Sequence, residues 1–278
     1  MKESESIRKT VRERYGERAK TGTSCCGTTS SCCDSTQTIS TKLGYSGQEL
    51  DSIPKGADLG LGCGNPTALA SLKPGEIILD LGSGAGIDCF LAANLVGETG
   101  HVIGVDMTAA MIDRARENAK KNDIDNVEFR LGEIEHLPAA DGTIDAVISN
   151  CVVNLSPDKQ QVFDEVYRTL KPGGRMMISD IVQLKPLPEG ILKSIEAYVG
   201  CVAGASLKQD YVSMIQAAGF RDVEILSETT FDAALPSSGD AKIVFDGQEV
   251  DPEEFGMTQD TVRDLAGSMA SISVRAFK

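Results

Sequence analysis

The stretch that decides the fold reads Ile-Ile-Leu-Asp-Leu-Gly-Ser-Gly-Ala-Gly over residues 77–86. Its first half is an apolar run typical of a buried strand, interrupted by Asp80 just before the glycines. Such a sequence predicts a strand that leads into a tight backbone turn at the start of a helix. An acid followed by a glycine turn at this point indicates a site for a nucleotide-type ligand.

The spacing of the glycines narrows the range of candidate ligands. Gly82, Gly84 and Gly86 follow G-x-G-x-G, whereas the dinucleotide fingerprint has G-x-G-x-x-G and directs helix amides at a pyrophosphate. A second apolar run ends at Asp106, roughly twenty residues on, where a carboxylate can accept hydrogen bonds from both ribose hydroxyls. The predicted ligand is therefore a nucleoside without phosphates, such as S-adenosylmethionine. The competing interpretation is a plain tight turn.

The length and composition of the chain limit its domain count, its partners and its location. The chain has 278 residues, enough for one large domain with additions or two small ones. Its 27 basic and 41 acidic side chains give a net charge of −14, which argues against nucleic acid or an anionic membrane as partner. The sequence shows neither a membrane-spanning apolar stretch nor a signal peptide. We therefore expect a cytoplasmic protein, with a monomer as the default.

Alternating apolar patterns predict a parallel sheet covered by helices. The expected helices cover residues 88–96, 108–121 and 156–170, and the expected further strands cover 102–106, 127–131, 144–149 and 176–182, the last after a turn at 171–174. The carboxyl ends of parallel strands share one edge, which is the usual ligand crevice. We therefore expect Gly82, Asp106, Gly132 and Cys151 to cluster there.

The two ends of the chain have different patterns. Residues 4–20 predict one exposed amphipathic helix, interpreted as a solvated cap. Towards the other end the expected helices cover 191–198 and 211–218, and the expected strands, 223–226 and 271–277, join the sheet as antiparallel edge members. The acidic, turn-rich residues 237–260 are expected to form a lid.

The eight cysteines are not expected to form a structural disulfide framework in the cytoplasm. Four of them form two adjacent pairs in a segment, 21–41, that is rich in Ser, Thr and Gly and is predicted to be mobile: Cys25, Cys26, Cys32 and Cys33. A zinc site is disfavoured there, since structural zinc sites favour cysteines separated by about two to four residues.

Three further cysteines border the predicted ligand edge although they lie far apart in the sequence. They are Cys63, Cys151 and Cys201. Three thiolates in a chain with only two histidines suit a soft, thiophilic acceptor. The competing interpretation is that all three are buried core cysteines, as Cys89 inside a helical pattern is expected to be.

Five motifs of this chain also carry a family resemblance. They are Leu-Gly-Cys-Gly-Asn-Pro at 61–66, Asp-Leu-Gly-Ser-Gly-Ala-Gly at 80–86, Gly-Val-Asp-Met at 104–107, Ser-Asn-Cys-Val-Val-Asn-Leu-Ser-Pro-Asp-Lys at 149–159 and Gly-Cys-Val-Ala-Gly-Ala at 200–205. Together they resemble the arsenite methyltransferase family. The likeness runs from the Cys-rich segment through about Gly219, and its three cysteine motifs are far more specific than the glycine turn.

The resemblance implies an α/β fold with a Rossmann-like class I methyltransferase sheet, a Cys-rich N-terminal segment and a smaller C-terminal α+β region. The chain then divides into an N-terminal helix with the Cys-rich segment, an S-adenosylmethionine-binding domain, and a C-terminal substrate-site and lid region whose strands complete the sheet: residues 1–60, 61–188 and 189–278.

The implied activity is S-adenosylmethionine-dependent methylation of trivalent arsenic, as arsenite and methylarsenite, in detoxification. By motif position, Cys63, Cys151 and Cys201 match the thiolates of the family, with Cys33, or else Cys32, as N-terminal partner. The doubled N-terminal pairs depart from family members that have one cysteine there. A thioredoxin-like protein or a small thiol is the implied reductant.

Within the donor site, the glycine turn is expected to approach the methionine part, and Asp106 and Met107 to hold ribose and adenine. Ile134 and Glu135 are expected to flank the adenine, and Asn150 to lie near the sulfonium; edge packing and a solvated charge are the alternatives for Met107, Ile134 and Glu135. The expected donor-site residues are Asp80, Gly82, Ser83, Gly84, Gly86, Asp106, Met107, Gly132, Glu133, Ile134, Glu135 and Asn150.

Arsenic(III) on thiolates keeps a lone pair and bears no proton, so methyl transfer would need positioning rather than a general base. Two other functions fit the sequence. One is a methyltransferase of the same fold for a small organic acceptor, in which the cysteines are packing residues. The other is a thiol protein that sequesters metalloids and keeps the nucleoside-binding fold as a scaffold.

Overall fold

The computed structural model describes residues 2–21, 40–41, 44–60, 72–187, 204–231, 243–245, 248–250, 258, 264 and 266–278. Several predictions fall outside the described residues. They concern the helix at 191–198, most of the lid at 237–260, and the cysteines Cys25, Cys26, Cys32, Cys33, Cys63 and Cys201.

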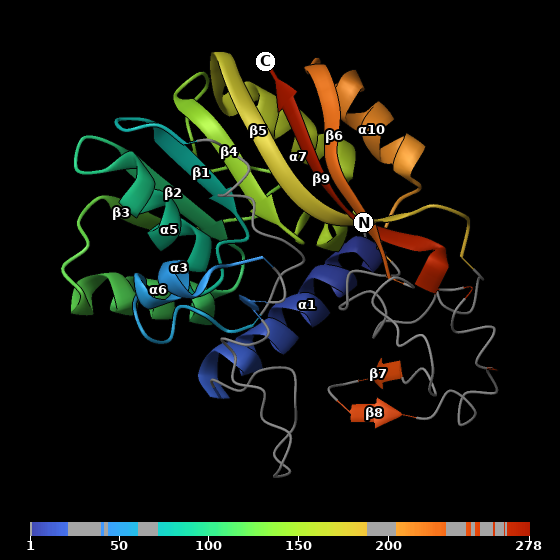
Figure 1. Ribbon diagram of the computed structural model, residues 1–278, viewed down its shortest axis with the longest axis horizontal. Coiled ribbons are helices and arrows are strands. Elements are labelled where there is room, and N and C mark those ends of the chain that lie inside the picture. The colour runs from blue at the N-terminus through green and yellow to red at the C-terminus, as the bar shows by residue number, and fades with distance from the viewer. Residues whose placement is uncertain are drawn as a thin grey trace.

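A mixed seven-stranded sheet forms the centre of the protein, in the order β3-β2-β1-β4-β5-β9-β6 (Figure 1). Its parallel strands are β1 (Ile77–Leu81), β2 (His101–Asp106), β3 (Val127–Leu131), β4 (Ile144–Asn150) and β5 (Leu170–Gln183). Two antiparallel strands follow, β6 (Arg221–Thr230) and β9 (Met269–Phe277). The strand order reverses between β1 and β4, and ligands of such sheets bind at this switch point.

Helices cover both faces of the sheet. The helices α3 (Gly47–Asp51), α5 (Ile87–Val96) and α6 (Ala109–Lys121) contribute to the core on one face, and α7 (Lys159–Thr169) and α10 (Lys208–Ala217) to the core on the other. Successive β1 residues alternate between these cores, with Ile78 facing α5 and Leu79 facing α7. The predicted α/β architecture is confirmed.

Helix α1 (Lys2–Thr21) runs along the edge of the sheet at which the parallel strands end (Figure 1). Its inner face is packed, with Val11 1% exposed and Ala19 also buried. The interpretation as a solvated cap is therefore wrong. The apolar positions of this helix are sparse, but they bury against the strand ends because charged side chains on the same face find partners there.

Two strand predictions need correction. The turn expected at residues 171–174 lies inside β5, where Gly173 has a φ of 80° and the pairing with β4 shifts register. This bulge lets the strand begin earlier, at Leu170. The C-terminal strand was expected at an edge, but β9 pairs with β5 on one side and β6 on the other.

Smaller elements complete the described fold. They are a 3-10 turn, η1 (Val153–Leu155), and a separate pair of antiparallel strands, β7 (Ile243–Phe245) and β8 (Gln248–Val250). Thr108 occupies the N-cap of α6, although its side chain makes no capping hydrogen bond.

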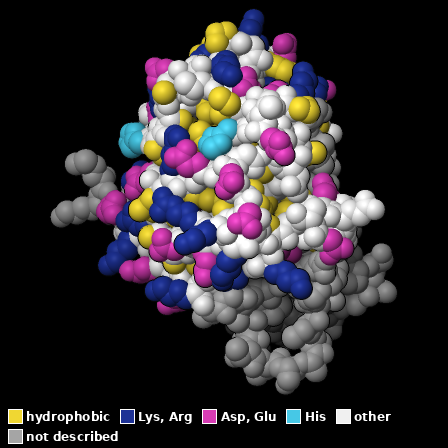
Figure 2. All heavy atoms as spheres, turned by 90° about the vertical axis from the view of Figure 1, so that its left-hand side faces the viewer, with side chains coloured by type: hydrophobic (Ala, Val, Ile, Leu, Met, Phe, Trp, Pro, Cys, Tyr) yellow, Lys and Arg dark blue, Asp and Glu magenta, His cyan; other side chains and the backbone are white. Residues whose placement is uncertain are grey.

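The face at the left of Figure 1, where β3 and α6 lie, mixes basic and acidic side chains (Figure 2). Several are paired, as in Arg130 with Glu128 at 2.8 Å and Lys121 with Glu117 at 2.7 Å. Among the described residues, basic side chains on this face are therefore interspersed with acidic ones. Among the described helices none is long and apolar enough to cross a membrane.

Candidate functional site

The glycine turn after β1 has the backbone that its sequence predicts. Gly82, Gly84 and Gly86 have φ values of 68°, 53° and 100°, in the region that favours glycine. A Cβ on Gly82 would collide with Val152, and one on Gly86 would lie 2.7 Å from the Phe90 ring. Gly84 differs, because nothing lies within 4 Å of a Cβ built there. The turn is therefore closed against the protein on two sides and open at Gly84.

Asp106 ties the glycine turn to the end of β2. Its Oδ2 accepts a hydrogen bond from the backbone N of Gly84 at 3.0 Å, and its Oδ1 accepts one from the N of Thr108 at 2.7 Å. The N of Gly82 in turn donates to Val105 O at 2.7 Å. These bonds bring Gly84 and Asp106 together as the sequence predicts.

Ser83 offers a test of whether this edge suits a nucleoside donor. Its Oγ is buried and has no hydrogen-bond partner among the residues that the structure describes. Leaving a buried hydroxyl unsatisfied costs about 1–3 kcal/mol, so a polar ligand group beside it would be stabilising. The orphaned hydroxyl and the open face of Gly84 fit a ligand rich in polar groups, such as S-adenosylmethionine.

A buried polar cluster that sequence reasoning missed lies beside the turn. The hydroxyl of Tyr45 donates to Asp88 Oδ1 at 2.8 Å, and Asn150 Nδ2 donates to that hydroxyl at 2.9 Å and to Asp88 Oδ2 at 3.4 Å. Burial raises the pKa of Asp88 to about 6. Asn150 is therefore held in place by residues from two distant segments. The sequence signal that could have indicated this cluster is Asp88, an acid inside the apolar run with which α5 begins.

Asp80 is also buried beneath the turn. Its Oδ2 accepts a hydrogen bond from Cys89 Sγ at 3.2 Å, and burial together with the charge of Asp88 raises its pKa well above the usual range. Cys89 is a free, fully buried thiol, which confirms its assignment to the core. Two facing acids with raised pKa values are features of functional sites, although structural networks also produce them.

The segment after β3 meets helix α1. Glu135 is 4% exposed, and its Oε1 accepts hydrogen bonds from Arg8 Nε at 3.3 Å, Arg8 Nη2 at 3.1 Å and Ser156 Oγ at 2.7 Å. Glu133 pairs with Arg12 at 3.2 Å. Glu135 is therefore not a solvated charge. Its carboxylate anchors α1 to the edge at which the donor site was predicted.

The remaining residues predicted beside the adenine are apolar. Ile134 is buried in the core on the α7 face, and Met107 packs, partly buried, in a cluster that contains Val11 and Cys151. Tyr15 of α1 packs against the same cluster. Helix α1 thus contributes apolar wall as well as charge to this edge.

Loss of the Arg8 side chain should destabilise the fold. Arg8→Ala removes two hydrogen bonds from the buried Glu135 carboxylate and leaves Ser156 as its donor among the described residues, so we expect a loss of about 1–3 kcal/mol in unfolding free energy. Lys9→Ala is the matched control on the exposed side of α1, where Lys9 lies 3.9 Å from Glu13 and the pair contributes little. Urea unfolding of both variants measures the difference; equal effects would contradict the anchor.

Cys151 follows β4 directly and has a strained backbone. Its φ is 60°, unusual for a residue other than glycine, and its N donates to Ser179 O at 2.8 Å. The side chain is 7% exposed, packs in a cluster with Val11, Leu155 and Ile181, and is disulfide-bonded. Its sulfur is therefore not a free thiolate in this state. Strained residues cluster at functional sites.

The ends of four neighbouring strands thus carry the predicted cluster: Gly82 after β1, Asp106 on β2, Gly132 after β3 and Cys151 after β4. A Cβ built on Gly82 would collide with Val152, so the glycine turn packs closely against the loop that carries Cys151. Cys63, Cys201, Cys32 and Cys33 lie outside the described residues, so their approach to this edge stays a prediction.

Neither histidine is part of this cluster. His101 begins β2, at the opposite end of the strand from Asp106, and His136 is exposed. In the described ranges no group of three or more His, Cys, Asp or Glu side chains could hold a metal ion. The site therefore has buried acids and a sulfur, with no imidazole base built into it among these residues.

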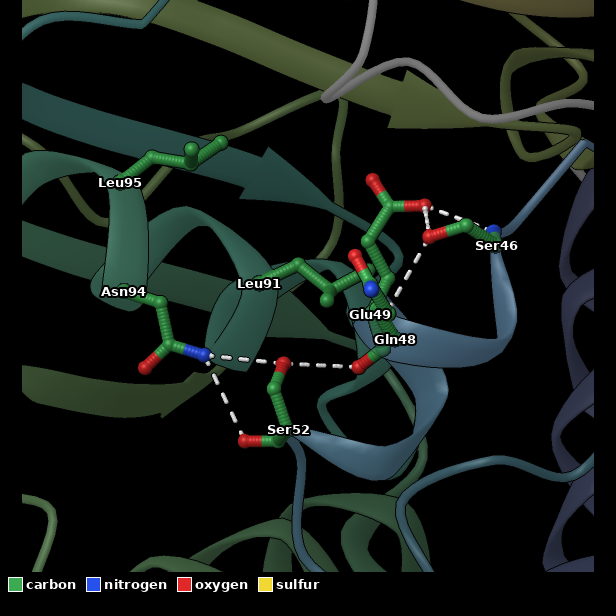
Figure 3. A pocket seen from close by; sticks show the side chains of 7 residues that line it. All are labelled: Ser46, Gln48, Glu49, Ser52, Leu91, Asn94 and Leu95. Atoms are coloured by element: carbon green, nitrogen blue, oxygen red, sulfur yellow. Dashed lines mark hydrogen bonds between the residues drawn. The ribbon is translucent and has the colours of Figure 1, made fainter.

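A shallow pocket of about 360 Å³ lies apart from this edge, between α3 and α5 (Figure 3). Its polar side chains largely bond one another: Glu49 Oε2 accepts from Ser46 Oγ at 2.8 Å, and Asn94 Nδ2 donates to Ser52 Oγ at 3.2 Å. Since these groups are satisfied locally, we assign the pocket no function.

The buried acid Asp88 makes stability depend on pH. Its pKa is about 6 in the folded protein, against roughly 4 for an unfolded chain, so the folded state binds more protons between these values. Stability from this group is present at low pH and is lost as pH rises towards 6. We expect the unfolding free energy of the wild type to fall relative to that of Asp88→Asn over this window, as measured by urea unfolding. A pH-independent difference would contradict the assignment.

Comparison with known proteins agrees with this geometry. Residues 72–219 match the methyltransferase domain family. An arsenic (III) S-adenosylmethionine methyltransferase from Chlamydomonas reinhardtii is 34% identical and matches with a TM-score of 0.63, over 86% of this chain and 73% of that one. This chain belongs to the arsenite methyltransferase family. Its fold is that of S-adenosylmethionine-dependent class I methyltransferases, as the sequence predicts.

Two further members of the arsenite methyltransferase family are similar over most of the chain. The arsenite methyltransferase of Halobacterium salinarum is 55% identical over 81% of this chain and 60% of its own length. That of Aquipseudomonas alcaligenes is 38% identical over 70% of this chain and 61% of its own length. The chain thus spans about three fifths of the length of these curated relatives.

Proposed function

We propose that this chain transfers a methyl group from S-adenosylmethionine to trivalent arsenic held by cysteine thiolates. One observation carries the proposal. In a chain whose relatives are named arsenite methyltransferases, Cys151 lies at the end of β4, next to the strand whose glycine turn suits the donor. Cysteine sulfur is the ligand that a soft acceptor such as arsenic prefers.

S-adenosylmethionine supplies an electrophilic methyl group when it is bound. The residues proposed to hold it are the predicted donor-site set. The open face of Gly84 would admit it closely, Ser83 Oγ would gain a hydrogen bond, and Asp106 would accept hydrogen bonds from the ribose. Asn150, fixed by Tyr45 and Asp88, would lie beside the reacting centre. All of these groups orient, and none has to move a proton.

The acceptor side of the proposal rests on sulfur. Cys151, with Cys63 and Cys201, would hold arsenic(III) with its lone pair directed at the methyl group, and Cys33 or Cys32 would be the N-terminal partner. Because the lone pair carries no proton, the exposed His136 is not needed as a base. The contribution of the protein is then positioning, which accounts for large rate effects when geometry is fixed.

The balance of electrons adds a redox step to the proposal. An arsenic–carbon bond forms, the carbon–sulfur bond of the donor breaks, and arsenic passes from the trivalent to the pentavalent state. Two electrons must then return, and a pair of cysteines that closes a disulfide can supply them. That Cys151 is disulfide-bonded supports this step, since the proposed arsenic ligand is also an oxidisable sulfur. A thioredoxin-like protein or small thiol would reopen the bond.

The remaining expectations from the sequence stay predictions. These are methylarsenite as a second acceptor, the identity of the reductant, a monomeric state, a cytoplasmic location and the division of the chain at residues 60 and 188.

Product analysis tests the proposed function. The reduced protein is incubated with arsenite, S-adenosylmethionine and a thioredoxin system, and arsenic species are separated and identified by mass spectrometry. Methylated arsenic supports the proposal. Bound arsenite without methylation would favour sequestration, and donor binding without arsenite binding would favour a small organic acceptor; both results would overturn it.

A further inference from the structure

The loop that carries Cys151 is fixed to β5 by one buried carboxylate that no part of the proposed chemistry uses. Asp180 is fully buried and lies on β5, directly after Ser179, whose carbonyl accepts the backbone hydrogen bond of Cys151. Its side chain reaches the far end of the same loop at Asn154.

Asp180 accepts four hydrogen bonds. Two come from Asn154, through its backbone N at 3.2 Å and its Nδ2 at 2.8 Å. The others come from Ile181 N at 2.9 Å and from the hydroxyl of Tyr211 on α10 at 3.1 Å. Asn154 Nδ2 also donates to Ile181 O at 2.6 Å. The loop is thus bound to β5 at both Cys151 and Asn154.

A position as unfavourable as that of Cys151 needs such support. A φ of 60° is unfavourable for a residue with a side chain, and it persists only where the surroundings impose it. Asn154 is itself held at a cost, since its Oδ1 is buried and has no hydrogen-bond partner in the described structure. In the described structure the side chain of Asp180 accepts hydrogen bonds from neutral donors, which makes this carboxylate an expensive support if stability alone were at stake.

We propose that Asp180 is a positioning residue for Cys151: through Asn154 it holds the loop in the one conformation that directs this sulfur at the donor edge. Its effect on catalysis rests on the proposed function, whereas its effect on the sulfur itself does not. Neither Asp180 nor Asn154 needs to touch donor or arsenic.

The first test compares two variants of the same cluster. Asp180→Asn keeps the shape but replaces an acceptor by a donor that faces other donors. Tyr211→Phe removes one bond to the same carboxylate from outside the loop. We expect Asp180→Asn to lower kcat about tenfold with the donor KM within about twofold, and Tyr211→Phe to retain kcat within about twofold. Equal losses in both variants would overturn the proposal.

The second test does not depend on arsenic. After reduction, the rate of Cys151 alkylation by iodoacetamide is followed by peptide mass spectrometry, with the fully buried Cys89 as internal reference. We expect Asp180→Asn to speed Cys151 alkylation by about fivefold and to leave Cys89 unchanged, because the loop opens locally. Unchanged Cys151 reactivity would overturn the proposal. The wild type's failure to methylate arsenic would count against the proposed function alone.

Asn154→Ala keeps both tests informative if Asp180→Asn folds poorly. It removes the side-chain bond from the other partner, so it should reproduce the fast alkylation of Cys151. Combined with Asp180→Asn, it should add little further, since the two changes break the same contact. Additive effects would show that the residues act separately and would contradict the clamp. Ser273→Ala, which removes the buried side-chain bond between β9 and Ser179 but leaves the Ser179 carbonyl and Asp180 in place, is the control for general loosening.

Discussion

Replacing Cys151 by serine is expected to lower the rate of arsenite methylation by about 10³-fold or more, since a hydroxyl is a poor, hard ligand for arsenic. Serine has nearly the same shape, and its backbone can keep the bond to Ser179 O. Donor affinity should therefore stay within about threefold of the wild type, because the glycine turn and Asp106 are untouched. Methylation rate by mass spectrometry and donor affinity by calorimetry measure the two quantities.

Cys89→Ser is the matched control for this change. It also exchanges a buried sulfur for oxygen, and the hydroxyl can still donate to Asp80. Methylation by this variant should stay within about threefold of the wild-type rate. A Cys151→Ser enzyme as active as Cys89→Ser would show that Cys151 is a packing residue. Arsenic would then have to be bound through sulfurs other than that of Cys151.

Replacing Gly82 by alanine is expected to weaken donor binding by about a hundredfold or more. The new Cβ would collide with Val152, and the φ of 68° disfavours any residue with a side chain. Relief of the collision has to move either the glycine turn or the loop before η1, and both border the proposed donor. Calorimetric titration with S-adenosylmethionine measures the loss.

Two other glycines separate the causes of that loss. Gly142 has a φ of 63° and open space around it, away from the strand ends, so Gly142→Ala reports backbone strain alone. Gly84→Ala also meets nothing in the protein, but its methyl would occupy space assigned to the donor. We expect weak binding in Gly84→Ala and normal binding in Gly142→Ala. Normal binding in Gly84→Ala would contradict the placement of the donor.

Much of the fold follows from local sequence patterns. The apolar runs that end at Asp80 and Asp106 are short, continuous and followed by turn or capping residues, so they predict parallel strands and the edge at which they end. The pairing of β9 between β5 and β6 could not be predicted in this way. It depends on contacts between segments that lie many tens of residues apart in the sequence, which no local pattern records.

In the candidate site, too, the features set by local sequence could be predicted and those set by long-range contacts could not. The glycine turn and Asp106 could be predicted because each directly follows or ends a short apolar strand, so local sequence fixes both. The Tyr45, Asp88 and Asn150 cluster could not, since its members come from three separate segments. Arg8 and Glu135 are a similar case. The sequence places Arg8 on a solvated helix and Glu135 beside the adenine, whereas the structure pairs the two side chains. The role of Asp180 depends on such a long-range contact as well.

The proposed function depends on transfer of the donor's methyl group onto arsenic bound at Cys151. The most direct test supplies S-adenosylmethionine with a deuterated methyl group, together with arsenite and a thiol reductant, to the wild type and to Cys151→Ser. We expect methylarsenic that carries the deuterium label from the wild type and none above background from the variant. Arsenic without a labelled methyl group from the wild type, or labelled methylarsenic from both proteins, would contradict this transfer.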